Sequence, residues 1–454
     1  MRRCDEEHAH RMSYIHGVGR TQGTLFPVML EELIPADHVC RVIDAFVQQL
    51  DMGRLGFLRA EAAETGRPPY DPRDLLRLYL YGYLHQIRSS RRLEEECKRN
   101  IEVMWLLGRL TPDHKSIAEF RRLHRDAVTK AGAELIRLAR SVGLVRGEWV
   151  AIDGSKFRAV SSSDSVHERR QLERYLERME QADAEEEVEI DPSAVAAALE
   201  KLQQHPEPEA RFMRTAQGKL PAYNVQIAAD SEHALIVAQT VSTEATDNRS
   251  LLPMAEAALE ALAAPDCLHV VADTGYSSGE QLEQCEAIGV VPHVPANRAP
   301  NNQGEGNLFD RSRFVYDQQT DTFRCPTGQV LKRRGFQRDR KRVIYQASRK
   351  ACGQCPLKSQ CTGSRRRTVY RLLHEESLQR SQERATAEAM RLRRSTVEYP
   401  FALLKYHIFG YPRFLLRGLR GAQTEISFAV MAYNLKRMIN VIGATPLIDQ
   451  FSSS

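Results

Sequence analysis

The stretch WVAIDGS, residues 149–155, decides the fold class of this chain. Its first four residues are apolar, and a short apolar run followed by turn residues is typical of a buried strand. A second apolar run, residues 267–272, is also followed by an aspartate, Asp273, and then by a turn. Carboxylates that follow strands gather at the carboxyl edge of an α/β sheet, so we expect Asp153 and Asp273 to lie near each other.

Strands and helices alternate around these two runs. A period-two pattern predicts a hairpin, apolar periodicity of three to four residues predicts helices, and a last apolar run predicts one more strand. The expected elements are strands 220–230, 234–243 and 290–294 and helices 249–263 and 279–287. This alternation predicts an α/β domain with partly parallel pairing.

The flanking segments are helical in pattern. Residues 27–145 show no strand pattern, and one of their helices begins with Asp71 as cap and Pro72 at the first helical position. Downstream we expect a basic helix over 376–396 and an amphipathic helix over 425–442.

Composition sets broad bounds. The chain has 454 residues, of which 42% are hydrophobic and 27% charged, which excludes a wholly disordered protein. No apolar run approaches the ~18 residues of a membrane span, and the N-terminus lacks the apolar stretch of a secretory signal. The nine cysteines do not form a disulfide framework, so the sequence predicts a cytoplasmic protein without a membrane partner.

Charge is unevenly distributed along the chain. The net charge is +5, but residues 164–209 carry −9 and residues 365–437 carry +9. Such asymmetry is typical of proteins that contact nucleic acid.

Two aspartates on neighbouring strands would hold a hard cation such as Mg²⁺ through oxygen ligands. The alternative is that Asp153 and Asp273 each cap a turn. A third acid, Glu398, follows Arg394 by four residues and precedes Lys405 by seven, so a continuous helix would place all three on one face. An exposed salt-bridge ladder is the alternative there.

Pro400, two residues after Glu398, predicts a kink or a helix boundary beside that acid.

Four cysteines gather within 37 residues: Cys325, Cys352, Cys355 and Cys361. The Cys-x2-Cys spacing of the middle pair is that of two thiolates that grip one tetrahedral ion, and the outer two would complete a structural zinc site. An iron–sulfur cluster and unligated thiols stay open as alternatives.

These motifs resemble those of a known family. Ile152-Asp153-Gly154-Ser155, Ala272-Asp273-Thr274-Gly275-Tyr276 and Arg394-x3-Glu398-x6-Lys405 look like the three acidic motifs of bacterial insertion-sequence DDE transposases. The likeness is to the IS-four/IS-five superfamily, and within it to the IS-eleven-eighty-two-like branch. Tyr70-Asp71-Pro72 and residues 111–121 resemble its N-terminal domain.

The resemblance implies an α/β fold with an RNase H-like catalytic domain, in which Asp153, Asp273 and Glu398 bind two Mg²⁺ (or Mn²⁺) ions. One ion would activate water or a 3′-hydroxyl and the other would stabilise the leaving oxygen.

It also divides the chain. The expected parts are a flexible arm (1–24), a helical N-terminal DNA-binding domain (25–145), the first part of the catalytic domain (146–300, with an acidic helical insertion over 164–212), a cysteine-rich insertion (301–372), the rest of the catalytic domain (373–445) and a tail (446–454).

The expected partners are double-stranded terminal inverted repeats and target DNA, and a second copy of the chain, since two ends must be joined. Arg394 and Lys405 would contact phosphates near the cleaved end, as would Arg391, which stands where the superfamily often has a tyrosine. Basic residues of one helix are the expected repeat reader: Lys115, Arg121, Arg122 and Arg125. A solvated helix face is the alternative for both groups.

The sequence therefore predicts a transposase that cleaves element ends and transfers strands into target DNA, acting on the bacterial nucleoid. Two alternatives share many of these features: an RNase H-like nuclease without strand transfer, and a DNA-binding protein that has lost catalysis.

Overall fold

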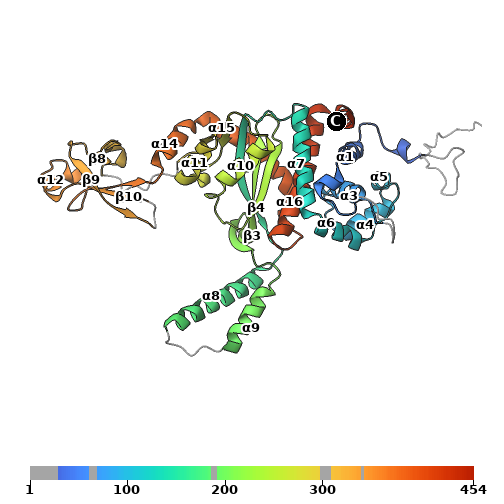
Figure 1. Cartoon of the computed structure of the whole chain (residues 1–454), viewed down its shortest axis with the longest axis horizontal. Helices are drawn as coiled ribbons and strands as arrows, with labels where there is room; N and C mark the ends of the chain where they lie inside the picture. The colour runs from blue at the N-terminus through green and yellow to red at the C-terminus, as the bar shows by residue number, and fades with distance from the viewer. Residues whose placement is uncertain (1–28, 61–68, 186–191, 297–307, 339–341, 454) are drawn as a thin grey trace, which may run out of the picture.

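The computed structural model describes residues 29–60, 69–185, 192–296, 308–338 and 342–453 (Figure 1). The predicted arm over residues 1–24 lies outside this part of the chain. In the described residues no helix is both long enough and apolar enough to span a bilayer.

The N-terminal part is entirely helical, as its pattern predicts. Its elements are η1 (Leu30–Leu33), α1 (Val39–Gln48), α2 (Met52–Leu55), α3 (Pro72–Leu84), α4 (Ser90–Arg99), α5 (Ile101–Leu106), α6 (His114–Leu123) and α7 (Arg125–Ser141). Asp71 caps α3 by accepting a hydrogen bond from Arg73 N, with Pro72 at the first position, because proline lacks the N–H that would otherwise be left unpaired there.

This helical part is not separate from the rest. Helices α3 and α7 pack against the long C-terminal helix α16 (Leu419–Ile442), where Phe428 stacks between Tyr79 and Tyr83. The same continuous apolar core extends into the large sheet. The N-terminal helices and the sheet therefore stabilise each other.

The large sheet is mixed. Its strands are β1 (Trp149–Arg158), β2 (Arg211–Thr215), β3 (Gly218–Asp230), β4 (Ile236–Ser242), β5 (Leu268–Val271) and β6 (Val290–His293). They lie in the order β2-β3-β1-β5-β6, with β4 also paired to β3. β1 runs parallel to β5 and β5 parallel to β6, while β3 is antiparallel to β1, β2 and β4. The predicted hairpin and the partly parallel pairing are thus present in a mixed α/β fold.

One detail of β1 differs from the prediction of a turn directly after Ile152. The strand continues to Arg158, because residues 150–158 pair with β3 throughout. Asp153 therefore lies within the strand, at the point where its other neighbour, β5, has ended at Val271.

Helices cover both the sheet and its connections. They are α10 (Leu251–Ala261), η2 (Thr274–Tyr276), α11 (Gly279–Ala287), α14 (Glu375–Arg384), α15 (Ala387–Ala402), the π-helix η4 (Leu403–Ile408) and α17 (Ala444–Ser453). Val397 of α15 packs against Ala151, Ala229 and Val271, so this helix covers one face of the sheet beside Asp153.

The C-terminal helices differ from the predicted ones in two ways. The basic helix expected over 376–396 is broken, since Thr386 caps a new helix by accepting from Ala389 N. That second helix continues through Pro400 to Ala402 and passes into the π-helix at Leu403, so the proline itself does not end it.

The acidic segment forms a hairpin of two helices, α8 (Ser163–Glu185) and α9 (Pro192–Gln203), which projects from the sheet (Figure 1). Its base is held by buried Glu207, which accepts from Ser161 N and from the Tyr223 hydroxyl. β2 begins at Arg211, so the last residues of the predicted insertion belong to the sheet.

A second, smaller sheet lies at the end of the molecule opposite the N-terminal helices (Figure 1). Its antiparallel strands are β7 (Val315–Asp317), β8 (Thr322–Arg324), β9 (Val330–Gln337), β10 (Arg342–Gln346) and β11 (Thr368–Leu372), in the order β11-β10-β9-β8-β7, with η3 (Arg311–Arg313), α12 (Arg349–Gly353) and α13 (Lys358–Cys361). This small-sheet unit, residues 308–372, has an apolar cluster of its own.

Candidate active site

Asp153 and Asp273 meet at the edge of the large sheet, as predicted. A single nitrogen of Arg393, on α15, bridges them: Arg393 Nη2 lies 2.7 Å from Asp153 Oδ1 and 3.3 Å from Asp273 Oδ2. Asp273 also caps η2, since its Oδ1 accepts from Gly275 N at 2.8 Å. The pair is therefore fixed by a strand, by a capped turn and by one cation.

The environment of Asp153 disfavours its charged form. The pKa of Asp153 is raised from 3.8 to about 6, chiefly by burial and in part by the negative charge of Asp273, while Arg393 and the Gly154 N–H act in the opposite direction. A buried carboxylate beside a like charge is typical of a site built to receive a cation.

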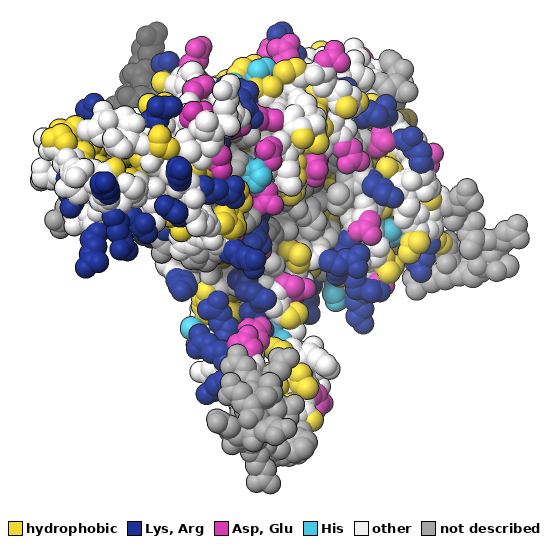
Figure 2. All heavy atoms as spheres, turned by 60° about the vertical axis from the view of Figure 1, so that its left-hand side comes forward, with side chains coloured by type: hydrophobic (Ala, Val, Ile, Leu, Met, Phe, Trp, Pro, Cys, Tyr) yellow, Lys and Arg dark blue, Asp and Glu magenta, His cyan; other side chains and the backbone are white. Residues whose placement is uncertain are grey.

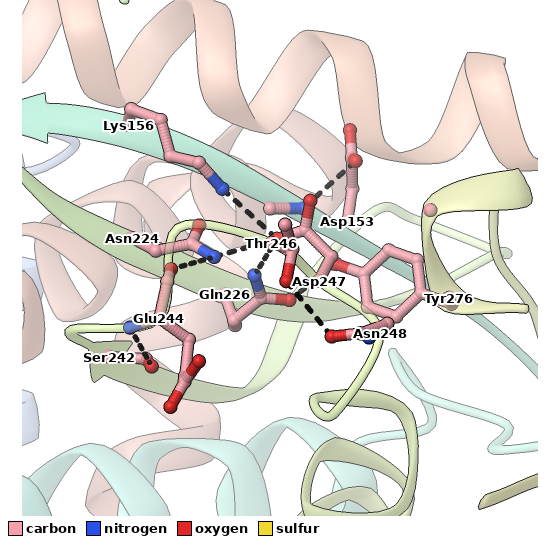
Figure 3. Close-up of polar contacts among 12 residues, drawn as sticks. Asp153, Lys156, Asn224, Gln226, Ser242, Glu244, Thr246, Asp247, Asn248 and Tyr276 are labelled. Atoms are coloured by element: carbon pink, nitrogen blue, oxygen red, sulfur yellow. Dashed lines mark hydrogen bonds and ion pairs between the residues drawn. The ribbon is translucent and has the colours of Figure 1, made fainter. Parts of the chain in front are cut away.

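A third carboxylate at this edge, Asp247, lies in the loop between β4 and α10. Its Oδ1 accepts from Lys156 Nζ at 3.1 Å, from Asn224 Nδ2 at 2.7 Å and from Gln226 Nε2 at 2.7 Å (Figure 3). Asn224 and Gln226 are fully buried on β3, opposite Lys156 and Gly154 of β1.

Tyr276 joins this group by donating to Gln226 Oε1 (Figure 3). Burial raises its pKa well above 10, and the negative charges of Asp247, Asp153 and Asp273 act in the same direction. Since all three carboxylates act on one phenol, they belong to a single electrostatic site.

Two glycines allow the backbone to approach these side chains. A Cβ on Gly154 would meet Gln226 Nε2 at 2.3 Å and Asp247 Oδ1 at 2.6 Å, and one on Gly275 would meet Asp273 Oδ1 at 2.9 Å. The glycines after Asp153 and after Asp273-Thr274 thus leave room for the polar groups around the pair.

Glu398 does not join the pair in this structure. It is exposed on α15, five residues after Arg393, and its side chain makes no hydrogen bond or ion pair with any residue in the described ranges. Lys405 is half-buried on the π-helix, its pKa lowered by burial and raised by the charge of Asp153, and its Nζ lies 5.7 Å from the Phe401 ring centroid. Lys405 is therefore close enough to Asp153 for the two charges to interact.

The residues present fit a hard divalent cation in one respect. Oxygen atoms of Asp153 and Asp273 both lie close to Arg393 Nη2. A cation placed between the two carboxylates could bind oxygen atoms of both. Among the described residues, the one group of three ligand atoms within 4.8 Å of one another is His38, Cys40 and Glu102, in the N-terminal helices. The predicted three-acid set is not at ligand spacing here.

The predicted DNA contacts divide by exposure. Lys115, Arg391 and Arg394 are exposed, and Arg125 is half-buried. Arg122 is exposed but pairs with Glu119 at 2.6 Å.

The prediction that Arg121 reads DNA does not fit its burial. Its guanidinium donates to Arg88 O at 3.2 Å and lies over the Tyr79 ring, so it belongs to the protein interior.

The four clustered cysteines come together. Cys325, Cys352, Cys355 and Cys361 line one cavity of about 20 Å³ in the small-sheet unit. Thr327 Oγ1 lies 3.1 Å from Cys325 Sγ and 3.8 Å from Cys355 Sγ, and Arg367 N donates to Cys352 Sγ at 3.5 Å. The thiols share a pocket, although no three of them lie within 4.8 Å of one another.

Sequence reasoning missed Arg393 and Asp247. A signal for Asp247 existed: Asn224 and Gln226 place two amides on one face of an otherwise apolar strand, which needs a buried polar partner. No comparable signal separated Arg393 from its basic neighbours.

Comparison with known proteins agrees with the motifs. A family described as Transposase domain (DUF772) matches residues 28–123, and one described as Transposase DDE domain matches residues 324–439. Together they indicate an insertion-sequence DDE transposase. Asp153 and Asp273 lie between the two matched segments, so their assignment rests on geometry.

Other comparisons add little to this identification. No curated protein matches this chain. The solved piggyBac transposase synaptic complex with hairpin DNA is 9% identical, over 92% of this chain and 84% of that one, with a TM-score of 0.26. A likeness at that score carries no argument about the fold or the site.

Proposed function

We propose that this transposase cuts DNA at the ends of an insertion sequence and joins those ends to target DNA, with the chemistry at Asp153 and Asp273. The observation that carries the proposal is that these two acids, 120 residues apart in sequence, face one cation at the carboxyl edge of a sheet. The order β4-β3-β1-β5-β6, with β3 antiparallel to its neighbours, supports an RNase H-like domain.

Asp153 and Asp273 would hold the divalent ion, Mg²⁺ or Mn²⁺, and Glu398 is proposed as the third acid. When bound, a pair of such ions supplies an activated oxygen nucleophile and stabilises the leaving oxygen at phosphorus. Glu398 would have to turn towards the pair from its exposed position on α15.

The chain's own residues prepare this site. Arg393 pairs with both aspartates and would be available to contact a phosphate if an ion took its place beside them. Asp247 joins β1 and β3 beside Asp153 through side-chain contacts with Lys156, Asn224 and Gln226. Lys405, near Asp153, is placed to contact a phosphate on the same side.

The remaining parts of the proposal follow the family. Exposed Lys115, Arg122, Arg391 and Arg394 would contact DNA backbone, the four thiols would bind structural zinc, and two copies would act together on two ends in the bacterial cytoplasm.

The test is cleavage of a repeat-ended duplex with Mg²⁺ or Mn²⁺. We expect Asp153→Asn and Asp273→Asn each to lower the cleavage rate by about 10³-fold or more while DNA binding changes little, because the ion supplies several kcal/mol of transition-state stabilisation. Asp266→Asn, an exposed aspartate just before β5, is the matched control and should cleave normally.

Two outcomes would change the proposal. Cleavage by Asp153→Asn or Asp273→Asn at the wild-type rate would remove that acid from the site. Cleavage without joining to a target duplex would identify a nuclease that lacks strand transfer.

A further inference from the structure

The small-sheet unit holds the excess positive charge of the chain. Residues 308–372 contain 17 lysines and arginines and four acidic residues, a net charge of +13. Because the whole chain carries +5, the rest of it carries −8. The repulsion among these charges destabilises so small a unit, and a polyanionic partner would relieve that repulsion.

We propose that one end of the small-sheet unit binds the phosphate backbone of duplex DNA without regard to sequence. This rests on the proposed function, in that DNA is the substrate. The residues that carry it, Lys332, Arg349, Lys350 and Arg365, are called the basic rim.

The strand register brings the basic rim together. Lys332 pairs with Gln346 and Gln346 with Thr368, so these three residues form one row across the sheet. The chain passes from Gln346 directly to Arg349 and Lys350, and it enters Thr368 from Arg365. Three distant segments therefore place cations at the same end of one sheet.

These cations are exposed and are not neutralised within the described chain. None of the four makes an ion pair with a described carboxylate, and all four side chains are exposed. Arginines elsewhere in or beside the unit do pair: Arg311 with Glu375, and Arg371 with Glu376 at 2.7 Å. Within the unit, Arg333 pairs with Asp321 at 3.3 Å. The basic rim therefore differs from these other cations of the unit, which have acidic partners.

An open groove of about 420 Å³ runs beside the rim. Lys350 lines it together with hydrogen-bonding side chains: Thr327, Gln329, Ser348 and Gln354. Hydroxyl and amide groups beside a lysine are the donors that proteins use on phosphate oxygens, which carry no sequence information. The groove thus supplies positioning contacts next to the charges.

The rim is also tied to the active site. β11 leads through α14 into α15, which carries Arg393 at the aspartate pair. Figure 2 shows Lys and Arg side chains gathered over the small-sheet unit and continuing towards the middle of the molecule. Duplex DNA, with one charge per ~1.7 Å of axis, is a partner long enough to contact both regions at once.

The experiment compares two charge-matched triple variants of the full chain. The rim variant is Lys332→Ala, Lys350→Ala and Arg365→Ala; the control is Lys130→Ala, Lys201→Ala and Lys436→Ala, exposed lysines on α7, α9 and α16. Binding to a repeat-ended and an unrelated duplex is measured with EDTA at several salt concentrations, and thermal unfolding verifies that both variants fold.

We expect the rim variant to lose affinity equally for both duplexes, with the slope of log K against log salt reduced by about 0.9 for each lost contact. The control should retain the wild-type slope. Unchanged rim binding, an equal loss in the control, or a loss confined to the repeat-ended duplex would overturn the inference.

A cleavage assay at saturating DNA separates this inference from the proposed function. If the rim variant still cuts when saturated, the rim acts in binding alone. If wild-type protein binds through the rim but never cuts, the proposed function fails and the inference stands.

Discussion

The two sheets of this molecule carry their polar chemistry in opposite places. In the large sheet it lies inside: Asn224 and Gln226 are fully buried and surround Asp247 under β1. In the small sheet the unpaired cations lie outside, on the basic rim at one end of a unit with a core of eight buried residues, although Arg367 is buried beside the thiols. In the proposed function, the first arrangement would fix atoms for a reaction and the second would attract DNA by charge.

This difference has a cost in stability. The large sheet shares one core with the N-terminal helices and α16, so its buried polar groups rest on a large apolar body. The small-sheet unit has 65 residues and a separate core, and units of this size are marginal without a metal, disulfides or exceptional packing. We therefore expect the stability of the large sheet to depend on the shape of its side chains. The stability of the small sheet should depend on bound metal and on charge.

Glycine substitutions test this contrast most strongly. Gly154→Ala in β1 places a methyl group 2.3 Å from Gln226 Nε2, whereas Gly335→Ala in β9 meets nothing within 4 Å. We expect Gly154→Ala to abolish cleavage and to cost about 1–3 kcal/mol of stability, as overpacking does in a core. The measurements are cleavage rate and urea unfolding.

Gly335→Ala is the matched control in the other sheet. It should cleave DNA normally and unfold at about the wild-type urea concentration. If the two variants behaved alike, the close approach of Asp247 and Gln226 to β1 would not matter for function.

Thiol substitution tests the small sheet. We expect Cys352→Ser to lose bound zinc and to expose the small-sheet unit to protease, since a structural metal supplies folding free energy to a small core. Cleavage by the large sheet at saturating DNA should fall much less. Metal analysis and limited proteolysis are the measurements.

The control for this substitution is Cys267→Ser, which changes an exposed cysteine next to β5. It should retain the metal and the protease resistance. If wild-type protein is purified without any zinc, the prediction of a zinc site is wrong and the four cysteines are unligated thiols.

Sequence predicted what depends on topology. The apolar runs before Asp153 and Asp273 form parallel neighbours, so the two aspartates meet where β5 ends, although β1 itself continues to Arg158. The four thiols likewise share a pocket.

What the sequence could not supply depends on side-chain packing in three dimensions. Arg393 and Arg394 are adjacent arginines, yet only Arg393 faces the aspartates. Arg121 looks like a surface cation but is buried over Tyr79. Whether Glu398 completes the site stays a prediction, because its exposed side chain makes no contact that fixes it.

The smallest expected effect is the pH dependence of stability at the large sheet. Because the pKa of Asp153 is raised from 3.8 to about 6, the folded protein binds its proton more tightly than the unfolded chain does. Below a pH of 3.8, Asp153 is protonated in both states and its raised pKa does not reduce the free energy of unfolding. As the pH rises, this free energy falls, and the loss is complete above a pH of about 6. In EDTA, Asp153→Asn should melt at a higher temperature than wild type at about pH 8 and at nearly the same temperature at about pH 4.

Mg²⁺ should reverse the difference at high pH by stabilising wild type alone, because a ligand that binds only the folded state raises its melting temperature. Asp266→Asn, exposed and away from the pair, should follow wild type at every pH. A variant less stable than wild type at high pH in EDTA would mean that the attraction of Arg393 outweighs burial. Asp153 and Asp273 would then form stabilising ion pairs with Arg393. The contrast between a large sheet that depends on close packing and a small sheet that depends on charge would no longer hold.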